Sequence, residues 1–132
     1  MELTMRNATI PQDIKNPKRK TIIAYKTYFD DFMDKLSVDE QDKIEDCLLL
    51  LETEDKIPRH YIKYIKDGIY EFRVTYKNNE FRILFIYDGE QIVVLFNSFK
   101  KKTQKTPQNE IDKALTLKKE YYESKRNNGT KH

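Results

Sequence analysis

The sequence predicts a single α+β domain, in which an N-terminal strand and a pair of helices pack on an antiparallel β-meander that is followed by a C-terminal helix. Three observations predict this class. The chain has 132 residues, a length typical of one domain. Apolar residues recur at helical spacing in the first half of the chain and alternate at strand spacing in the second half. Aromatic residues make up 12% of the chain, which suits a buried core and argues against disorder.

The first half of the predicted domain is a short strand followed by two helices. Residues 21–25 form a β-branched apolar run that indicates the strand. Residues 28–36 carry apolar side chains at the i, i+3, i+4, i+7 spacing of a helix. Ser37 and Glu40 form the S-x-x-E capping box that begins a second helix. Cys47 lies on the apolar stripe of this helix, so we expect a buried, unreactive thiol.

The second half is predicted to contain three strands and the final helix. Residues 56–66 are expected to be a loop in which basic and aromatic residues alternate. Turn residues at 77–80 and at Asp88-Gly89 separate three strand-like runs and predict hairpins between them. Strands joined by hairpins pair antiparallel. Pro107 begins the final helix, since proline is favoured near a helix start.

Both ends of the chain lack a regular pattern. Residues 1–20 are expected to be a flexible N-terminal extension and residues 125–132 a polar tail, which leaves residues 21–124 as the domain. No apolar run is long enough to span a membrane, and the N-terminus lacks the apolar stretch of a signal peptide. The sequence therefore predicts a cytoplasmic protein that does not contact membranes.

Composition excludes several kinds of site. One cysteine excludes an internal disulfide and a multi-cysteine metal site, and two histidines argue against a histidine-based one. Three glycines leave no glycine-rich phosphate loop. No Ser-His-Asp or Cys-His arrangement is present. We therefore expect no metal and no other cofactor.

Charge is separated along the chain although the net charge is only +3. Residues 27–55 contain eleven acidic and two basic side chains, whereas residues 56–105 contain eleven basic and five acidic ones. A basic surface favours a polyanion, and an acidic surface favours solvent or a basic partner. Charge blocks also solvate helices without binding anything, and charge alone does not separate these two interpretations.

Two strand arginines, Arg73 and Arg82, are the principal candidates for a functional site. An arginine inside a strand is costly unless its guanidinium reaches a carboxylate, a phosphate or water. One interpretation is a structural pair between Arg73 and Glu71, which lie on one face of the strand. An anion site is favoured instead by the surrounding lysines, although a lysine run can also be a solvated loop. These lysines are Lys63, Lys66, Lys100, Lys101, Lys102 and Lys105.

Aromatic residues are interleaved with these cations. Tyr61, Tyr64 and Phe99 are positioned to stack on unpaired bases. Stacking on aromatic side chains beside a basic surface is how proteins hold single-stranded RNA. The pattern therefore favours RNA as the polyanion.

Three segments resemble the RelE/ParE superfamily of bacterial type II toxins, and in particular its HigB-like, phage host-killing-related branch. They are KYIKDGIYEFRV at 63–74, FRILFIYDGEQIVVLFNSFKKKTQKTP at 81–107 and EID at 110–112. The element F-x-K-K-x-x-K-T-P is the most specific part. The resemblance covers about residues 21–120 and implies a RelE-like fold, in agreement with the order of elements given above.

The resemblance implies a toxin that cleaves mRNA on the ribosome by attack of the RNA 2′-OH on the adjacent phosphate, without a metal. Arg73 and Arg82 would contact the scissile phosphate. Lys63 and Lys66 match the basic loop before the strand, and residues 100–102 match the basic segment after the last strand. The implied partners are the ribosome, mRNA and an antitoxin with a helix-turn-helix domain. That antitoxin would cover the basic surface or the acidic helices.

The general acid and base are not assigned by the resemblance. Some members use a histidine or tyrosine near the C-terminal end, but Tyr121 and Tyr122 lie far along the last helix and His132 lies in the tail. His60 or a lysine of lowered pKa are the remaining candidates. Two alternatives therefore stay open: a non-catalytic RNA- or antitoxin-binding module, and a gyrase inhibitor of the same superfamily.

Overall fold

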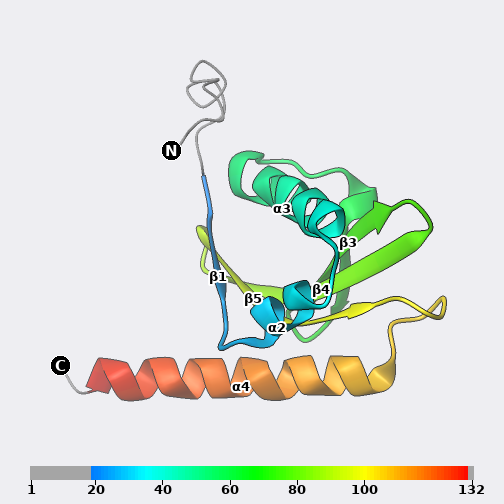
Figure 1. The fold of residues 1–132 in the computed structure, drawn as a ribbon. Helices are drawn as coiled ribbons and strands as arrows, with labels where there is room; N and C mark the ends of the chain where they lie inside the picture. The colour runs from blue at the N-terminus through cyan, green and yellow to red at the C-terminus, as the bar shows by residue number, and fades with distance from the viewer. Residues whose placement is uncertain (1–18, 131–132) are drawn as a thin grey trace.

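The computed structural model describes residues 19–130 as a five-stranded sheet with helices on both faces (Figure 1). This architecture confirms the predicted α+β class, with the helical pair before the meander and one helix after it. In the labels of Figure 1 and in chain order, the elements are β1 (Thr21–Ala24), α2 (Tyr28–Asp34), α3 (Val38–Thr53), η2 (Arg59–Tyr61), β2 (Ile62–Lys66), β3 (Ile69–Tyr76), β4 (Asn79–Asp88), β5 (Ile92–Lys100) and α4 (Gln108–Thr130).

The strands lie in the order β1-β5-β4-β3-β2. The hairpins β3–β4 and β4–β5 form the predicted antiparallel meander. β2 pairs antiparallel with β3, whereas β1 pairs parallel with β5 at the opposite edge. Arg73 and Arg82 therefore come from two neighbouring central strands.

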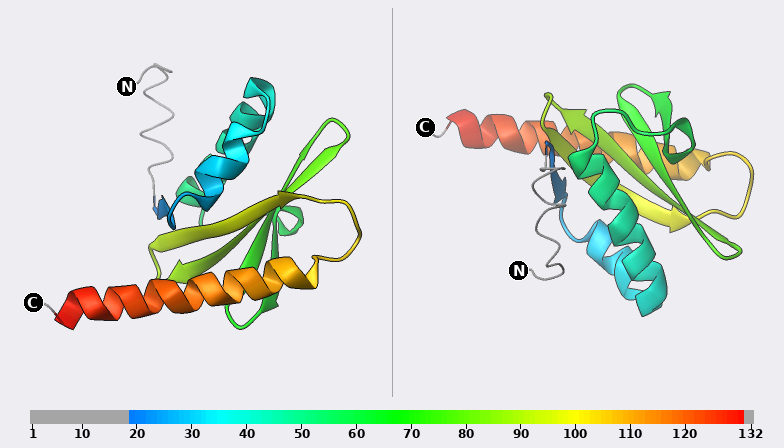
Figure 2. Two further views of the ribbon diagram at one scale, coloured as in Figure 1. Left: turned by 60° about the horizontal axis from the view of Figure 1, so that its bottom comes forward. Right: turned by 90° about the horizontal axis from the view of Figure 1, so that it is seen from above.

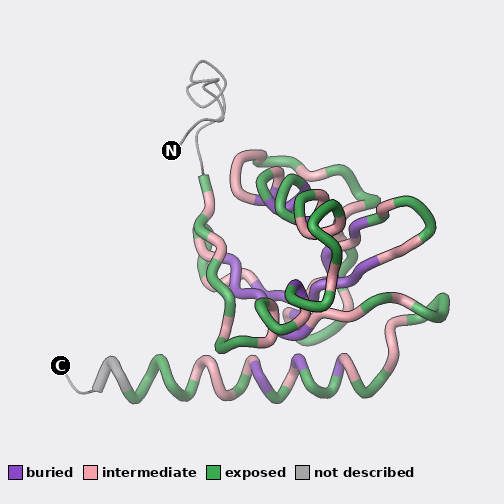
Figure 3. The backbone as a smooth tube through the Cα atoms, viewed as in Figure 1, coloured by how far each residue is buried: buried purple, intermediate pink, exposed green. Residues whose placement is uncertain are grey.

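Two hydrophobic cores fill the space on either side of the sheet. α2 and α3 cover one face, where Phe72 and Phe85 are fully buried, and α4 lies along the other face over Leu84 and Phe96 (Figure 2). In Figure 3 the buried residues gather on the strands and on the sheet-facing sides of α3 and α4. Side chains alternate between the two faces along β4, as the period of a strand requires. Each fully buried large apolar side chain contributes about 1.5–3 kcal/mol.

The predicted capping box begins α3. The Glu40 backbone N–H donates to Ser37 Oγ at 3.1 Å, and the Ser37 N–H donates to Glu40 Oε1 at 2.9 Å. The Gln41 side chain donates to the carbonyl oxygens of Met33 and Leu36, which joins α3 to the end of α2. Cys47 is buried on the same helix, and burial raises the pKa of its thiol, so the prediction of a buried cysteine is confirmed.

The prediction that residues 56–66 form a loop is wrong. Residues 56–66 contain η2 and β2, and β2 is an edge strand with Ile62 opposite Phe72 and Lys63 opposite Glu71. The alternation of apolar and polar residues is weak in β2, because a strand at the edge of a sheet exposes most of its side chains. Pairing with the strongly patterned β3 makes these residues a strand.

The last helix is also longer than the prediction. α4 continues to Thr130, past the expected start of a polar tail at Lys125. Lys125 Nζ lies 2.6 Å from Asp88 Oδ2, and this ion pair holds the helix against the end of β4. The predicted flexible extension lies mostly outside the described residues, as does His132. Its last two residues, Arg19 and Lys20, donate backbone hydrogen bonds to the Glu52 carbonyl.

None of the helices within residues 19–130 is both long enough and apolar enough to cross a membrane.

Candidate functional site

Arg73 and Arg82 lie side by side in the sheet. They are register partners on β3 and β4, so their side chains leave the same face of the sheet. The Arg82 side chain is 6% exposed, whereas the Arg73 side chain is 32% exposed. Both line a cavity of about 450 Å³. The cavity therefore has one buried guanidinium, that of Arg82, and one more accessible guanidinium, that of Arg73.

A buried carboxylate joins the two arginines. Glu71 is 1% exposed, and its Oε1 atom accepts a hydrogen bond from Arg73 Nε at 3.1 Å. Arg82 Nε lies 3.6 Å from the same oxygen, and the Thr106 hydroxyl donates to Oε2. The structural pair between Glu71 and Arg73 that the sequence suggested is therefore present. It is part of a larger network that includes both arginines.

A second carboxylate, Glu80, lies at the more open side of this network. Arg82 Nη2 donates to Glu80 Oε1 at 2.8 Å, and Lys101 Nζ lies 3.5 Å from the same atom. The hydrogen bond from Arg82 and the charge of Lys101 lower the pKa of the Glu80 carboxyl, so it is ionised at neutral pH. Arg82 also donates to the Phe81 carbonyl at 3.1 Å. Arg82 is thus held on several sides, and its position is fixed before any ligand arrives.

The cavity around these groups is cationic. It is lined by Lys43, Cys47, His60, Tyr61, Arg73, Thr75, Glu80, Arg82 and Lys101. Four cations therefore face Glu80 and the adjacent buried Glu71. The excess of positive charge suits an anion, and guanidinium groups with fixed direction suit a phosphate.

Two aromatic rings form part of the cavity wall. The His60 and Tyr61 rings lie 4.2 Å apart between centroids, and Tyr61 stacks on Phe72 at 5.9 Å with an interplanar angle of 15°. Tyr61 is therefore anchored on the core through its neighbour. His60 is the one histidine among residues 19–130. An imidazole at this position can act as a general base or a general acid.

The remaining predicted lysines do not line this cavity. Residues 100–102 line a second cavity of about 320 Å³, which shares Glu80 and Lys101 with the first. Lys63 and Lys66 are exposed on the edge strand β2, and Lys105 is exposed in the loop before α4. The structure brings Arg73, Arg82, Tyr61 and Lys101 together and leaves the other predicted lysines outside this cavity.

Lys43, Thr75 and Glu80 line the cavity but were not predicted as site residues. Lys43 is one of only two basic residues in the acidic segment 27–55. That isolation is the one feature of the sequence that could have indicated a site role for Lys43. Thr75 shares its strand face with Arg73, because the two residues are two positions apart on β3. Glu80 pairs with Thr75 across the hairpin, and this register depends on the turn.

The C-terminal tyrosines do not reach this cavity. The Tyr121 hydroxyl donates to Asp88 Oδ2 at 2.6 Å, and burial together with this hydrogen bond raises the pKa of Tyr121. Asp88 lies six residues after Arg82 on β4, which is about 20 Å along a strand. Tyr121 and its neighbour Tyr122 therefore anchor α4 and take no part in the arginine site.

No group of three or more His, Cys, Asp or Glu side chains within the described part of the chain is placed to hold a metal ion.

The mixed α+β fold, with its five-stranded sheet and C-terminal helix, is consistent with a RelE-like fold. The family model "Phage derived protein Gp49-like (DUF891)" matches residues 31–119. The chain therefore belongs to this phage-derived, toxin-like family, and membership implies an antitoxin partner. No curated protein matches the chain.

Proposed function

We propose that the chain is the toxin of a type II toxin–antitoxin system, of the HigB-like branch, and that it cleaves mRNA on the ribosome. The observation that supports this most strongly is the register pairing of Arg73 and Arg82 inside a cavity that also contains His60 and Lys101. The proposed activity requires a cytoplasmic protein, because its substrate is mRNA on translating ribosomes.

In the proposed reaction the RNA 2′-oxygen attacks the adjacent phosphorus. The new bond joins the 2′-oxygen to phosphorus, the bond to the 5′-oxygen breaks, and a 2′,3′-cyclic phosphate and a 5′-hydroxyl result. His60 accepts the 2′-OH proton, and the leaving 5′-oxygen takes up a proton from the cavity or from water. The phosphorane carries more negative charge than the ground-state phosphate, so fixed cations accelerate its formation.

The two arginines have different tasks in this proposal. Arg73 is the more exposed of the two and keeps N–H groups besides Nε to donate to a phosphate oxygen. Arg82 is held by Glu71, Glu80 and the Phe81 carbonyl, so it provides charge at a fixed place. Preorganised donors of this kind are each worth about 10²–10³-fold in rate.

The outer cations and the tyrosine provide binding. Tyr61 stacks on a base beside the scissile phosphate, as aromatic rings do with unpaired RNA. Residues 100–102, with Lys105, Lys63 and Lys66, attract the phosphate backbones of mRNA and rRNA. Because this attraction is spread over many charges, no single lysine dominates it.

A specific observation favours one alternative, a non-catalytic RNA- or antitoxin-binding module. Both arginines already have carboxylate partners, Glu71 and Glu80, and such a network also stabilises a sheet that performs no chemistry. In an active site, the same network would hold the two guanidinium groups in a fixed direction. A cleavage assay separates the two.

The test adds the purified protein to mRNA in three mixtures: with translating ribosomes, with idle ribosomes, and alone. Primer extension maps the cleavage sites, and the cyclic phosphate at the new 3′ end is detected by its resistance to a ligase. Cleavage confined to translating ribosomes supports the proposal. Binding without cleavage supports the alternative, and inhibition of DNA supercoiling by gyrase would contradict both.

A further inference from the structure

A further cavity, of about 640 Å³, lies at the end of β5 beyond its pairing with β1. β1 pairs with residues 92–95, so the rest of β5 has no strand beside it on that side within the described chain. α2 and the first turn of α4 bound this space, and three phenylalanines line it: Phe32, Phe81 and Phe99. The volume of this phenylalanine cavity is within the range of about 300–1,000 Å³ that is usual for ligand pockets.

The phenylalanine cavity contains rings on which a flat ligand can stack. Phe32 and Phe99 are half-buried, whereas Phe81 is fully buried. The Phe32 ring packs edge-to-face on Phe81, with ring centroids 6.0 Å apart and an interplanar angle of 74°. This contact holds the Phe32 ring in place. A ligand that stacks on it therefore avoids part of the entropic cost of ordering a side chain.

The Ser98 hydroxyl lines the same cavity without a hydrogen-bond partner. Its Oγ atom is buried, and no donor or acceptor among the described residues reaches it. Buried polar groups in native proteins are normally bonded, so an exception needs a physical reason. A hydroxyl can both donate and accept a hydrogen bond, which suits the mixed donors and acceptors at the edge of a nucleobase. A ligand with such an edge would supply the missing partner.

Three exposed lysines, Lys35, Lys100 and Lys102, line the phenylalanine cavity. None of them makes an ion pair with residues 19–130. Lys100 attracts Glu40 electrostatically, but the two side chains do not form an ion pair. Each ammonium group has three N–H donors. The lysines are therefore available to pair with the phosphates of a ligand.

The two carboxylates that line the cavity are already bonded within the fold. Glu40 accepts hydrogen bonds from the Ser37 backbone N–H at 2.9 Å and from Asn79 Nδ2 at 3.0 Å. Glu110 Oε1 accepts a hydrogen bond from Asn97 Nδ2 at 2.9 Å. These contacts cap α3 and attach the start of α4 to β5. The carboxylates therefore have structural partners, whereas the lysines of the cavity have no ion-pair partner in the described part of the chain.

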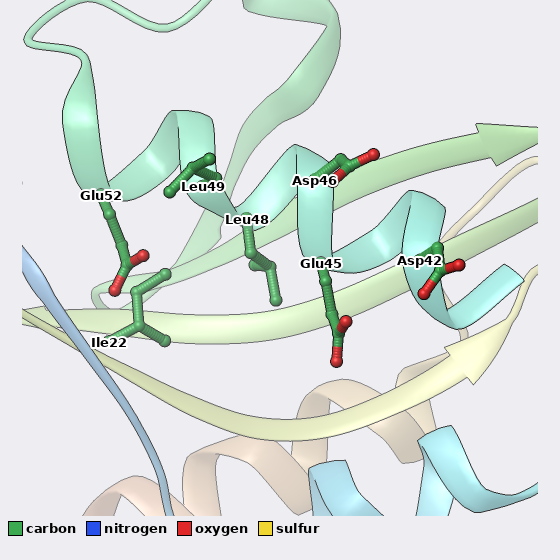
Figure 4. Close-up of a pocket in the computed structure, with 7 residues that line it drawn as sticks. All are labelled: Ile22, Asp42, Glu45, Asp46, Leu48, Leu49 and Glu52. Carbon is green, nitrogen blue, oxygen red and sulfur yellow. The ribbon is translucent and has the colours of Figure 1, made fainter. Parts of the chain in front are cut away.

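The groove between α3 and β1 has the opposite chemistry (Figure 4). Its volume is similar, about 570 Å³, but all of its polar lining residues are acidic: Asp42, Glu45, Asp46 and Glu52. Carboxylates repel a phosphate, so this groove does not suit a nucleotide. The combination of aromatic rings, an unbonded hydroxyl and lysines is a property of the phenylalanine cavity and not of every hollow in the surface.

The phenylalanine cavity is connected to the arginine cavity by the loop after β5. Residues 100, 102 and 103 line both the phenylalanine cavity and the cavity of about 320 Å³, which in turn shares Glu80 and Lys101 with the arginine cavity. Within the sheet, Phe99 is the register partner of Arg82. A chain of phosphates can therefore pass from one cavity to the other over the lysines. A free mononucleotide would occupy only one of the three cavities, so this continuity favours a strand of RNA.

We propose that the phenylalanine cavity binds an unpaired base of the RNA strand whose phosphate lies in the arginine cavity. The base stacks on Phe32, the Ser98 hydroxyl bonds to its edge, and Lys35 pairs with a flanking phosphate. Because Ser98 contacts the base itself, the cavity contributes to the choice of the sequence that is bound. The RNA as the source of the base rests on the proposed function, whereas the chemistry of the ligand rests on the cavity.

The test measures binding of two fluorescein-labelled probes to the full-length protein by fluorescence anisotropy. The first is a single-stranded RNA of about six nucleotides, a length within the range that single-strand-binding grooves cover. Its 2′-hydroxyls are methylated, so it cannot be cleaved by 2′-OH attack. The second is the same sugar-phosphate chain without bases, which carries the same charge. The RNA should bind about tenfold or more tightly than the chain without bases, because stacking needs a base.

Matched variants locate the base. Phe32→Leu should weaken binding of the RNA by about tenfold and leave the chain without bases unchanged. Phe29→Leu, at a half-buried phenylalanine of the same helix that does not line the cavity, should change RNA binding by less than about twofold. Ser98→Ala should weaken RNA binding by about threefold to tenfold without lowering the urea midpoint, because the hydroxyl makes no bond in the fold. Ser124→Ala, at an exposed serine of α4, should change neither.

A charge variant tests the flanking phosphate. Lys35→Gln should weaken binding of both probes, because it removes a phosphate contact and not a base contact. The slope of log affinity against log salt concentration should fall by about 0.7, the value for one phosphate of a single strand. Lys119→Gln removes the same charge from an exposed position of α4 that lines none of the cavities described above, and it should leave both affinities unchanged.

The proposal is supported if the base-dependent part of the affinity is lost in Phe32→Leu and Ser98→Ala but kept in their matched controls. Equal binding of the two probes, or equal weakening by Phe29→Leu and Phe32→Leu, would overturn it. Adenosine 5′-monophosphate that competes at the concentration of the RNA would show that the ligand is a free nucleotide, and the assignment to RNA would be wrong. Circular dichroism checks that each variant is folded, and Ser98→Ala keeps the test valid if Phe32→Leu unfolds.

The binding measurement contains no ribosome, so its outcome is independent of the cleavage assay. Base-dependent binding without cleavage would contradict the proposed activity and leave the phenylalanine cavity as a base site. Cleavage at the parental rate with binding that does not depend on the base would contradict the phenylalanine cavity alone.

Discussion

Replacement of Glu71 by glutamine should destabilise the fold by about 3 kcal/mol. Removal of one partner from a buried ion pair costs about 3–5 kcal/mol, because the other charge is left without compensation. The lower end applies here for two reasons. Arg82 keeps its hydrogen bonds to Glu80 and to the Phe81 carbonyl. Arg73 is 32% exposed and can turn toward water. A domain of this size has about 5–15 kcal/mol of stability, so the variant still folds.

Urea unfolding followed by circular dichroism measures this loss, and a thermal melt should shift down by about 10–15 °C. Glu80→Gln is the matched control, since it also removes one carboxylate from Arg82. Its side chain is 45% exposed, so that change should cost less than about 1 kcal/mol. If Glu71→Gln unfolds at the parental midpoint, or if Glu80→Gln costs as much, the buried network is not what holds the arginines.

Three further predictions follow from single contacts. Ser37→Ala removes the acceptor that caps α3 and should cost about 1 kcal/mol in urea unfolding; an unchanged midpoint would mean that the cap is not needed. Contacts with Lys125 and Tyr121 lower the pKa of Asp88, so this group stabilises the fold above about pH 4 and loses that effect as pH falls through its folded-state pKa. Asp88→Asn keeps a good turn before Gly89, and it should lower stability at pH 7 while making unfolding less sensitive to acid; an identical pH profile would contradict this. Lys102→Ala should weaken ribosome binding more at low salt than at high salt, with little effect on the cleavage step, and a rate defect without a binding defect would place Lys102 in the chemistry.

Local patterns predicted most of the fold. The alternation along β3, the dipeptide Asp88-Gly89 and the capping box at Ser37 each depend on residues close in sequence, and each is present in the structure. β2 was missed because its pairing partner is needed to define it: Lys63 and Tyr64 are exposed on an edge strand and carry no apolar face. The end of α4 was missed for a similar reason. Lys125 is polar, and it is held by Asp88, a residue far away in sequence.

The candidate site could be predicted only in part. Sequence alone indicated that Arg73 and Arg82 needed partners, because charges inside strands are costly. Their mutual position could not be predicted, since the register that places them opposite each other depends on the tight turn after Tyr76. Lys43 reaches the same cavity from α3, and no local pattern connects it to the strands.

The most direct test of the proposed chemistry is single-turnover cleavage by Arg73→Ala on programmed ribosomes. Arg73 is the better position to change, because Arg82 is almost fully buried and its loss threatens the fold. The rate should fall by about 10²–10³-fold, while ribosome affinity changes little, since many other cations share that attraction. A thermal melt must first show that the variant is folded. If the folded variant cleaves at the parental rate, Arg73 serves only its structural pair with Glu71, and the phosphate site is not in this cavity.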